Sequence, residues 1–400
     1  MAQNPNNLPY FKCRPTAEEK ALANFLLRKF RPGIKKKIPQ HYLVQPIPSK
    51  TLEFIKRISK KYPYFLRFDI KLYYPSILPQ ILLEKLSSIY RKILEKPPSR
   101  RFKNYLKNEI PKFLANSPYG KGIPIGSRLS FTLAGIFLLD LDYKMMGIRY
   151  PFLRQNDDYL VFCRNKKGAE NLLKNIILPK LSELGLEINE KKLRSGKFHQ
   201  DRVSFIGFDF FAGYFTISEE KIEEFKKKII KLTYLTKKKP EKAVIKSLNN
   251  QILGFGHYYK FANCKRVYEE LDAFIRMRLR RYLSRNKNSK NREGNLLLTN
   301  ETLKNLGLKS LLEIKEKYAS KKKHIFRKKA RNKAKTGEVK NSPKWTQFEE
   351  VEFKYQQKLI LSQLKQLTNS LNKVEKRLTN LEQKLVTKNN NKKSKSIRNF

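Results

Sequence analysis

Short apolar runs separated by acidic residues mark two candidate strand regions in this chain. Phe65-Leu66-Arg67-Phe68-Asp69-Ile70 has the alternation that is typical of a short strand. Farther on, one apolar run ends at Leu153, a second begins at Tyr159, and the pair Asp157-Asp158 lies between them. This arrangement predicts a β-hairpin that carries the two acids at or beside its turn.

Other segments have the apolar spacing of a helix. Between Lys167 and Leu184, Leu and Ile recur every three or four positions, and Gly185 follows. Residues 218–283 are also helical in pattern and are strongly basic. Because the strand patterns fall between residues 63 and 217, the sequence predicts an α+β fold in which β-α-β-β units precede a helical domain.

A heptad pattern occupies residues 356–386. The apolar positions there are separated by alternating steps of four and three: Ile360, Leu364, Leu367, Leu371, Val374, Leu378, Leu381 and Leu385. This spacing predicts a coiled coil with another copy of the chain or with a partner helix. The alternative is a single long helix packed on its own domain. We interpret residues 284–355 as a basic connector and residues 387–400 as a basic tail.

The charge of the chain points to a polyanionic partner. Its 400 residues contain 88 Lys and Arg against 35 Asp and Glu, for a formal net charge of +53. A field of this strength attracts nucleic acid, and an anionic membrane is the competing partner. However, no apolar run approaches the roughly 20 residues that span a bilayer, and residues 1–7 lack a signal pattern. We therefore expect a cytoplasmic protein of two or three domains with no membrane partner.

Three acids are the candidate catalytic residues. Asp-Asp pairs often form exposed turns, which is the alternative interpretation of Asp157-Asp158. The strand that carries Asp69 could pair beside the hairpin and bring a third carboxylate to the same point. Carboxylates on neighbouring strands are the ligands that two-metal phosphoryl transfer requires. The sequence therefore predicts a site for two Mg²⁺ ions, with Mn²⁺ as an alternative. The three cysteines are far apart, and neither a disulfide framework nor a zinc site follows from them.

The order of these motifs resembles the reverse transcriptases of bacteria, particularly the group II intron lineage and its relatives. The resemblance covers residues 63–283. It rests on Phe68-Asp69-Ile70-Lys71 through Ser76-Ile77, Gly122-Ile123-Pro124-Ile125-Gly126 with Ser130 and Leu133-Ala134, the Asp157-Asp158 box, Leu184-Gly185-Leu186 through Lys192, and Phe205-Ile206-Gly207-Phe208. Gly254 to Lys260 and Arg278 to Leu283 are similar to the thumb and maturase-specific helices of intron-encoded enzymes.

The resemblance implies a right-hand polymerase with a fingers and palm domain over residues 63–217, an antiparallel palm sheet and an α-helical thumb over 218–283. Residues 1–62 would form a basic extension of the fingers. The implied activity is RNA-directed DNA synthesis from deoxynucleotides on an RNA template and a DNA or RNA primer. The implied roles are metal binding by Asp69, Asp157, Asp158 and the Ile70 carbonyl; nucleotide binding by Tyr74, Ile125, Gly126 and Lys192; and primer or template binding by Gly207, Tyr258, Tyr259, Lys260, Arg278 and Arg281.

Two positions depart from the family pattern. Gln155 stands where the Asp-Asp box normally has Tyr or Phe, and Ile125 stands where many relatives have Gln. The Gly-Ile-Pro-x-Gly pattern with its following Ser and Leu-Ala is more similar to the defence-associated bacterial enzymes, and an enzyme of a retroelement is the alternative. We keep two alternatives, a maturase-like RNA-binding chaperone with impaired catalysis and a polymerase that adds nucleotides without a template. We also expect Tyr74 to lie beneath the sugar of the incoming nucleotide, with Tyr73 as the alternative.

Overall fold

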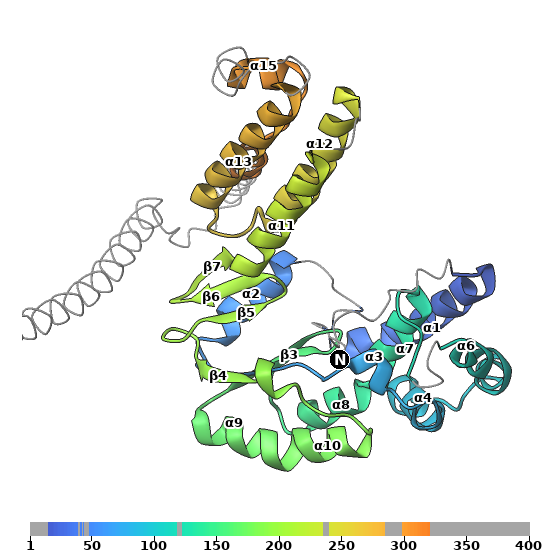
Figure 1. Cartoon of the computed structure of the whole chain (residues 1–400). Helices are drawn as coiled ribbons and strands as arrows, with labels where there is room; N and C mark the ends of the chain where they lie inside the picture. Colours follow the sequence, from blue (N-terminus) through green and yellow to red (C-terminus); the bar gives the residue numbers. More distant parts are fainter. Residues whose placement is uncertain are drawn as a thin grey trace, which may run out of the picture. The chain divides into compact units, whose positions relative to one another are not determined.

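The computed structural model describes residues 15–38, 41, 43, 48–117, 122–234, 240–284 and 298–320 (Figure 1). This part of the chain contains helices and two antiparallel sheets, which confirms the predicted α+β class. The predicted coiled coil and basic tail lie outside the described residues. No described helix has the length and apolar character that crossing a membrane requires.

The first sheet has the strand order β2-β3-β1-β4, and the second has the order β5-β6-β7. Their bounds are β1 Tyr64–Phe68, β2 Phe152–Gln155, β3 Asp158–Cys163, β4 Arg194–Lys197, β5 Val203–Phe205, β6 Phe208–Phe211 and β7 Tyr214–Ile217. The central strand β1 pairs with both β3 and β4, so the segment that carries Asp69 lies inside the sheet rather than at its edge.

Helices precede, separate and follow the strands. Those before the hairpin are α1 Ala17–Lys37, α2 Pro48–Ile58, α3 Tyr73–Ser76, α4 Pro79–Leu94, α5 Arg100–Asn104, η1 Tyr105–Glu109, α6 Ile110–Ala115, α7 Arg128–Phe137 and α8 Leu139–Gly147. After it come α9 Lys166–Leu172, η2 Leu173–Ile177, α10 Leu178–Glu183, η3 Glu190–Lys192, α11 Glu219–Leu232, α12 Glu241–Tyr259, α13 Lys265–Ser284 and α15 Asn300–Asn305. The continuous helical run α9-η2-α10 confirms the helix predicted from apolar spacing.

The alternation of β1 divides the buried residues into two cores. Tyr64, Leu66 and Phe68 pack with α1, with α3 to α8 and with α9 and α10, whereas α2 packs in the other core through Leu52 and Ile55. Phe65 points to the other face, where it packs with the second sheet and helices α11 to α13. Successive side chains on a strand point to opposite faces, so residues 67 and 69 lie on the same side as Phe65. This alternation directs Asp69 toward the side of the sheet on which α11 to α13 lie.

Residues 298–320 extend the helical domain. They fall in the segment interpreted from sequence as a basic connector, yet Leu303 and Leu311 are buried against α12 and α13. The Asp272 carboxylate on α13 accepts hydrogen bonds from the backbone N–H of Leu311 at 2.9 Å and of Leu312 at 3.1 Å. The carboxylate thus satisfies free N–H groups at the start of the helix over 311–320, which attaches this helix to α13.

Candidate active site

Asn156 and Asp157 form the two-residue turn of the β2-β3 hairpin. Gln155 pairs with Asp158 across the strands, so the acid pair begins in the turn and ends on β3. Asn156 has a φ of 61°, and positive φ at a central residue is usual in two-residue hairpin turns. Asn is one of the few residues besides Gly that adopts positive φ at low cost. The predicted hairpin with acids at its turn is confirmed.

The structure brings Asp69 to the same end of the sheet. Phe68, the last residue of β1, pairs with Tyr159 of β3, so Asp69 follows directly beside Asp158. Asp158 is on the same face of β3 as Leu160, which packs in the second core with Phe65. Strand alternation therefore places Asp69 and Asp158 on one face, and Asp157 joins them from the turn.

Two cations contact these acids. The Arg67 guanidinium donates to both carboxylate oxygens of Asp158, from Nε at 3.0 Å and from Nη2 at 2.9 Å. Lys192 Nζ donates to Asp69 Oδ2 at 2.7 Å. The sequence analysis gave Lys192 a role but missed Arg67. The signal was available, because Arg67 precedes Asp69 by two positions and therefore lies on the same face of the strand.

The pKa values of the acids show that negative charge is concentrated here. Burial, together with the charges of Asp69 and Asp158, raises the pKa of Asp157 to about 7. Burial also raises the pKa of Asp158, although Arg67 opposes this shift. The hydrogen bond to Asp69 raises the pKa of Lys192. Arg67 and Lys192 thus compensate the site only in part, and it retains an attraction for a further cation.

The carboxylate oxygens of the three acids are chemically suited to bind a divalent cation. Carboxylate oxygens are the ligands that Mg²⁺ prefers, and Asp157 has no cationic partner among the contacts described above. Yet nowhere in residues 15–320, as far as they are described, are three or more His, Cys, Asp or Glu side chains grouped closely enough to hold a metal ion. In the structure Arg67 and Lys192 engage two of the three carboxylates. Ile70, the other predicted ligand, continues from β1 in an isolated bridge to Ile188.

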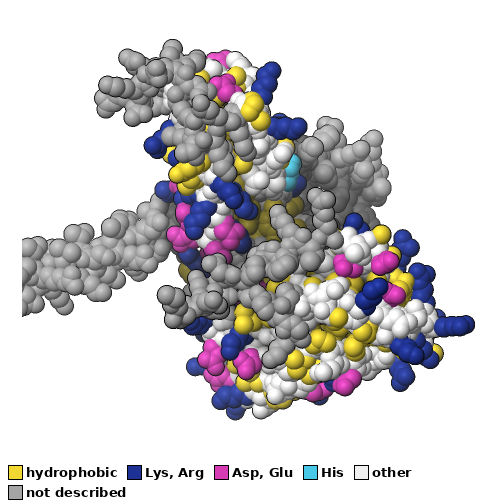
Figure 2. Space-filling model, turned by 45° about the vertical axis from the view of Figure 1, so that its right-hand side comes forward, with side chains coloured by type: hydrophobic (Ala, Val, Ile, Leu, Met, Phe, Trp, Pro, Cys, Tyr) yellow, Lys and Arg dark blue, Asp and Glu magenta, His cyan; other side chains and the backbone are white. Residues whose placement is uncertain are grey.

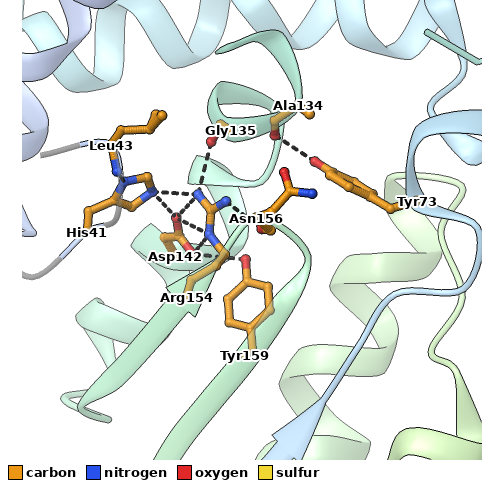
Figure 3. Close-up of polar contacts among 9 residues, drawn as sticks. All are labelled: His41, Leu43, Tyr73, Ala134, Gly135, Asp142, Arg154, Asn156 and Tyr159. Atoms are coloured by element: carbon orange, nitrogen blue, oxygen red, sulfur yellow. Dashed lines mark hydrogen bonds and ion pairs between the residues drawn. The ribbon is translucent and has the colours of Figure 1, made fainter. Parts of the chain in front are cut away.

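A buried ionic network supports the turn from behind (Figure 3). The Arg154 side chain, which is fully buried, donates to both carboxylate oxygens of Asp142 on α8. It also donates to the backbone oxygens of Gly135 on α7 and Asn156 in the turn, at 2.9 Å each. Tyr159 Oη donates to Asp142 at 2.9 Å. Arg154 therefore links the β2-β3 turn to two helices of the other core.

His41 completes this network from the N-terminal segment. Its Nδ1 accepts a hydrogen bond from the Leu43 backbone N–H at 3.1 Å, and its Nε2 lies 3.3 Å from Asp142 Oδ2. Burial and the positive charge of Arg154 lower the pKa of His41 to about 4, so the ring is neutral at pH 7. Burial would raise the pKa of Asp142, but Arg154 and His41 hold it below its usual value. The sequence analysis missed His41 and Arg154.

The two adjacent tyrosines have different environments. Tyr73 is buried and donates to the Ala134 carbonyl at 2.6 Å (Figure 3). Tyr74 is only partly buried, and its hydroxyl donates to Asn156 Oδ1 in the catalytic turn at 3.1 Å. The structure therefore places Tyr74, and not Tyr73, beside the acids. Gly122, with a φ of +76°, packs against the backbone here, since an added Cβ would lie 2.6 Å from the Tyr74 oxygen.

Ile125 and Gly126 lie just before α7. Ile125 is partly exposed and Gly126 is exposed with a φ of 99°. Ser127 then caps α7 by accepting from the Ser130 backbone N–H at 3.0 Å. This loop resembles the nucleotide-positioning motif. It connects Gly122, which packs against the Tyr74 backbone, to α7, whose Gly135 carbonyl accepts from Arg154.

A cavity of about 930 Å³ lies beside the acids, and both sheets and the helical domain line it. Its walls include Arg67, Gln155, Asp158, Lys192, Ile206, Gly207, Tyr258 and Tyr259. The exposed position of Gln155 at the end of β2 accounts for its polar side chain, which faces the cavity rather than a core. Of the three acids, Asp158 lines this cavity.

The turn between β5 and β6 is held against α12. The Tyr258 hydroxyl donates to the Ile206 carbonyl at 3.0 Å, and a Cβ added to Gly207 would lie 2.5 Å from Tyr259 Oη. Ile206 and Gly207 both have positive φ, at 48° and 82°, which is strained for the β-branched Ile206. The structure therefore brings together Gly207, Tyr258 and Tyr259, as the proposed primer contacts require.

The other predicted primer or template contacts do not line this cavity. Lys260 Nζ lies over the ring of Phe261, at 5.3 Å from its centroid. Arg278 donates to Thr233 Oγ1 at 3.1 Å, which joins α13 to the end of α11. Arg281 is exposed near the end of α13. The nucleic-acid roles of these three residues stay predictions.

Comparisons with known proteins agree with this geometry. The model of the reverse transcriptase (RNA-dependent DNA polymerase) family matches residues 12–210, and the model of the group II intron maturase-specific domain matches residues 222–297. Among curated proteins, no sequence matches the chain.

Solved structures of telomerases are similar to this chain at low identity. Apo telomerase from Candida tropicalis has 13% identity and a TM-score of 0.43, over 66% of this chain and 50% of the telomerase. Telomerase from Candida albicans in complex with a TWJ fragment of telomeric RNA has 13% identity and a TM-score of 0.39, over 73% and 55% of the two chains. This chain thus spans about half the length of these telomerases.

The two family matches follow one another without overlap and divide the chain where the fold changes. The first covers the helices and sheet that carry the acids, and the second covers helices α11 to α13. The chain belongs to the group II intron-like reverse transcriptases, in which a right-hand polymerase domain is followed by a maturase-specific domain.

Proposed function

We propose that this chain is an RNA-directed DNA polymerase that extends a primer 3′ end by two-metal phosphoryl transfer. The observation that carries the proposal is the placement of Asp69, Asp157 and Asp158 at one end of the first sheet, where Asp158 lines the large cavity and the pKa of Asp157 is raised to about 7. Negative charge that the protein compensates only in part is the electrostatic requirement for binding divalent cations.

In this proposal the three carboxylates hold the divalent cations, which supply Lewis-acid activation of the 3′ oxygen and charge neutralisation at the phosphate. Arg67 and Lys192 hold Asp158 and Asp69 in place before binding. Lys192 is 59% exposed and bound through a single carboxylate oxygen, so it can turn to the leaving pyrophosphate. Gly207 lets the Tyr259 hydroxyl approach the β5-β6 turn closely, and we place the primer strand against this turn at the cavity wall.

An RNA template suits the charge of the chain. Lys and Arg side chains are spread over the molecular face shown in Figure 2, and acidic side chains form smaller groups there. Cations distributed in this way bind phosphate backbones through counterion release, with no dependence on base sequence. A defence-associated role is part of this proposal, and it rests on the similarity of the pattern from Gly122 to Gly126 to that of the defence-associated enzymes.

A primer-extension assay tests the proposal. Purified full-length protein with Mg²⁺ should extend an oligo(dT) primer annealed to poly(rA), and Asp157→Asn or Asp158→Asn should abolish extension. Losing one ligand charge should cost several kcal/mol of transition-state stabilisation, which is a loss of roughly a hundredfold or more. Asp201→Asn is the matched control, because Asp201 is exposed and does not line the cavity. Wild-type turnover in both site variants would exclude the acid pair.

One observation favours a second function, that of an RNA-binding chaperone. Arg67 and Lys192 occupy two of the carboxylates, as they would in a site that no longer binds metal. RNA binding by a wild type that extends no primer would support this alternative. Extension of the primer without the poly(rA) strand would instead support the template-independent polymerase.

A further inference from the structure

A short hydrogen-bonded chain joins Tyr74 to Asp157 through one side chain. The Tyr74 hydroxyl donates to Asn156 Oδ1 at 3.1 Å, and Asn156 Nδ2 donates to Asp157 Oδ1 at 3.0 Å. Tyr74 comes from α3, 82 positions before Asn156, so the contact depends on the tertiary fold. The tyrosine expected beneath the sugar and the carboxylate expected to hold metal are thus two hydrogen bonds apart.

The Asn156 amide fits these two hydrogen bonds in one orientation. A carboxamide presents one acceptor oxygen and one donor nitrogen, and here the oxygen faces a hydroxyl and the nitrogen faces a carboxylate. The reversed amide would place its oxygen against Asp157 Oδ1, where two acceptors would repel. Asn156 therefore fits between its two partners in one orientation. An aspartate at this position could not supply the donor, and an alanine could supply neither group.

The backbone of Asn156 is fixed as firmly as its side chain. Its φ of 61° is a conformation that Asn tolerates and most residues do not. Its carbonyl accepts from Arg154 Nη1 at 2.9 Å, and Arg154 is itself fully buried (Figure 3). Because the turn cannot shift freely, the amide is a rigid connection between its two partners.

Tyr74, at the other end of these hydrogen bonds, is also anchored. Next to Tyr74, the Tyr73 ring is buried and its hydroxyl is bound to Ala134. The Tyr74 carbonyl accepts from the Ile123 backbone N–H at 3.0 Å. The Tyr74 ring packs edge-on against the Tyr73 ring and against the first core, and the hydrogen bond from its hydroxyl to Asn156 ties the ring to the turn.

We propose that Asn156 is a positioning residue that couples the ring of Tyr74 to the Asp157 carboxylate, so that sugar selection and catalytic geometry depend on each other. This inference rests on the proposed polymerase function. A ring displaced by a 2′-hydroxyl would pull on the amide and move the carboxylate away from its productive place. A ribonucleotide would therefore be rejected by slower chemistry as well as by the size of the ring.

Two substitutions remove these hydrogen bonds while they keep the Tyr74 ring and the β2-β3 turn. Tyr74→Phe keeps the ring and removes the hydroxyl, and Asn156→Gly keeps a residue that accepts positive φ and removes the amide. Tyr73→Phe is the matched control, since it removes a neighbouring tyrosine hydroxyl whose hydrogen bond does not reach the turn. Thermal unfolding of each variant identifies any that fails to fold.

The assay measures kcat and KM for dTTP and for UTP on poly(rA) with an oligo(dT) primer. Because one hydrogen bond contributes about 0.5–1.5 kcal/mol, Tyr74→Phe and Asn156→Gly should each lower kcat for dTTP about three- to tenfold. Each should also raise the use of UTP relative to dTTP. The kcat of the double variant should be no lower than that of the less active single variant, because both substitutions break the same pair of hydrogen bonds. Tyr73→Phe should keep the wild-type sugar preference.

The outcomes distinguish this inference from the function on which it rests. A wild type without polymerase activity would overturn the proposed function, and the inference with it. An active wild type whose sugar preference and kcat are unchanged in Tyr74→Phe and Asn156→Gly would overturn the inference alone. Additive losses in the double variant would also overturn it, because the two residues would then act independently.

Discussion

Replacing Arg154 by methionine should destabilise the protein far more than removing an exposed arginine. The Arg154 and Asp142 side chains are both fully inaccessible to solvent. Methionine would fill most of the volume but would leave the Asp142 carboxylate buried without its cation. Breaking a buried ion pair from one side costs about 3–5 kcal/mol. Tyr159 and His41 would still contact Asp142, so we expect a loss near the lower end, at about 3 kcal/mol.

Urea denaturation followed by far-ultraviolet circular dichroism measures this loss as a change in the free energy of unfolding. Arg128→Met is the matched control, because Arg128 is exposed at the start of α7 and should change stability by less than about 0.5 kcal/mol. Combining Arg154→Met with Asp142→Asn removes both charges. The double variant should therefore be less destabilised than the sum of its single variants, by about 1 kcal/mol or more.

Catalysis provides a second measurement of the same substitution. Arg154 donates to the Asn156 carbonyl, so the methionine variant should let the catalytic turn move and should lower kcat even at temperatures where it remains folded. A destabilisation below about 1 kcal/mol, or additive effects in the double variant, would refute the argument. Either result would mean that the guanidinium and the carboxylate do not form a buried, coupled pair.

Four further predictions concern pH, the primer and assembly. The pKa of Asp157 is raised to about 7, so its contribution to stability is present at low pH and is lost as pH rises through 7. Without metal, Asp157→Asn should therefore increase the free energy of unfolding over that of the wild type more at pH 8 than at pH 5, as measured by urea denaturation. The pKa of His41 is lowered to about 4, which has the opposite effect: about 3 kcal/mol of the free energy of unfolding is lost as pH falls from 6.5 toward 4. His41→Gln should make the free energy of unfolding less dependent on pH over this range. Tyr258→Phe should raise KM for the primer about three- to tenfold with kcat unchanged, because it frees the strained β5-β6 turn; an unchanged KM in primer titration would contradict this role. For the heptad segment, Leu371→Glu with Leu378→Glu should dissociate an oligomer in light scattering, and a wild type that is already monomeric with no partner recovered would mean that the segment packs on its own chain.

Three of the six non-glycine residues with positive φ in the described part of the chain adjoin the candidate site. Besides Asn156 and Ile206, Leu72 has a φ of 45°, and it follows Asp69 by three positions. A side chain of this kind costs about 1–2 kcal/mol in the left-handed region, so the surrounding contacts must hold it there. The three turns or bends that carry these residues adjoin the first acid, the acid pair and the proposed primer contact.

The sequence by itself determined the elements and the chemical identity of the site. Two-residue alternation in β1 was enough to put Asp69 and Arg67 on one face, and the apolar runs around Asp157 predicted the hairpin turn. Apolar spacing predicted the helical run from α9 to α10. These features depend on neighbours within a few positions, and local periodicity encodes them directly.

Only the tertiary structure decided which side chains meet. His41 reaches a network with Arg154 across 113 positions, and Arg67 pairs with Asp158 across 91. The choice between Tyr73 and Tyr74 also stayed open until α3 was seen against the hairpin, because both tyrosines have the same local pattern. Contacts of this kind depend on strand register and on how far-apart segments pack. Neither is written in the spacing of residues along the chain, since buried polar groups find partners wherever the fold brings a complementary group within hydrogen-bond distance.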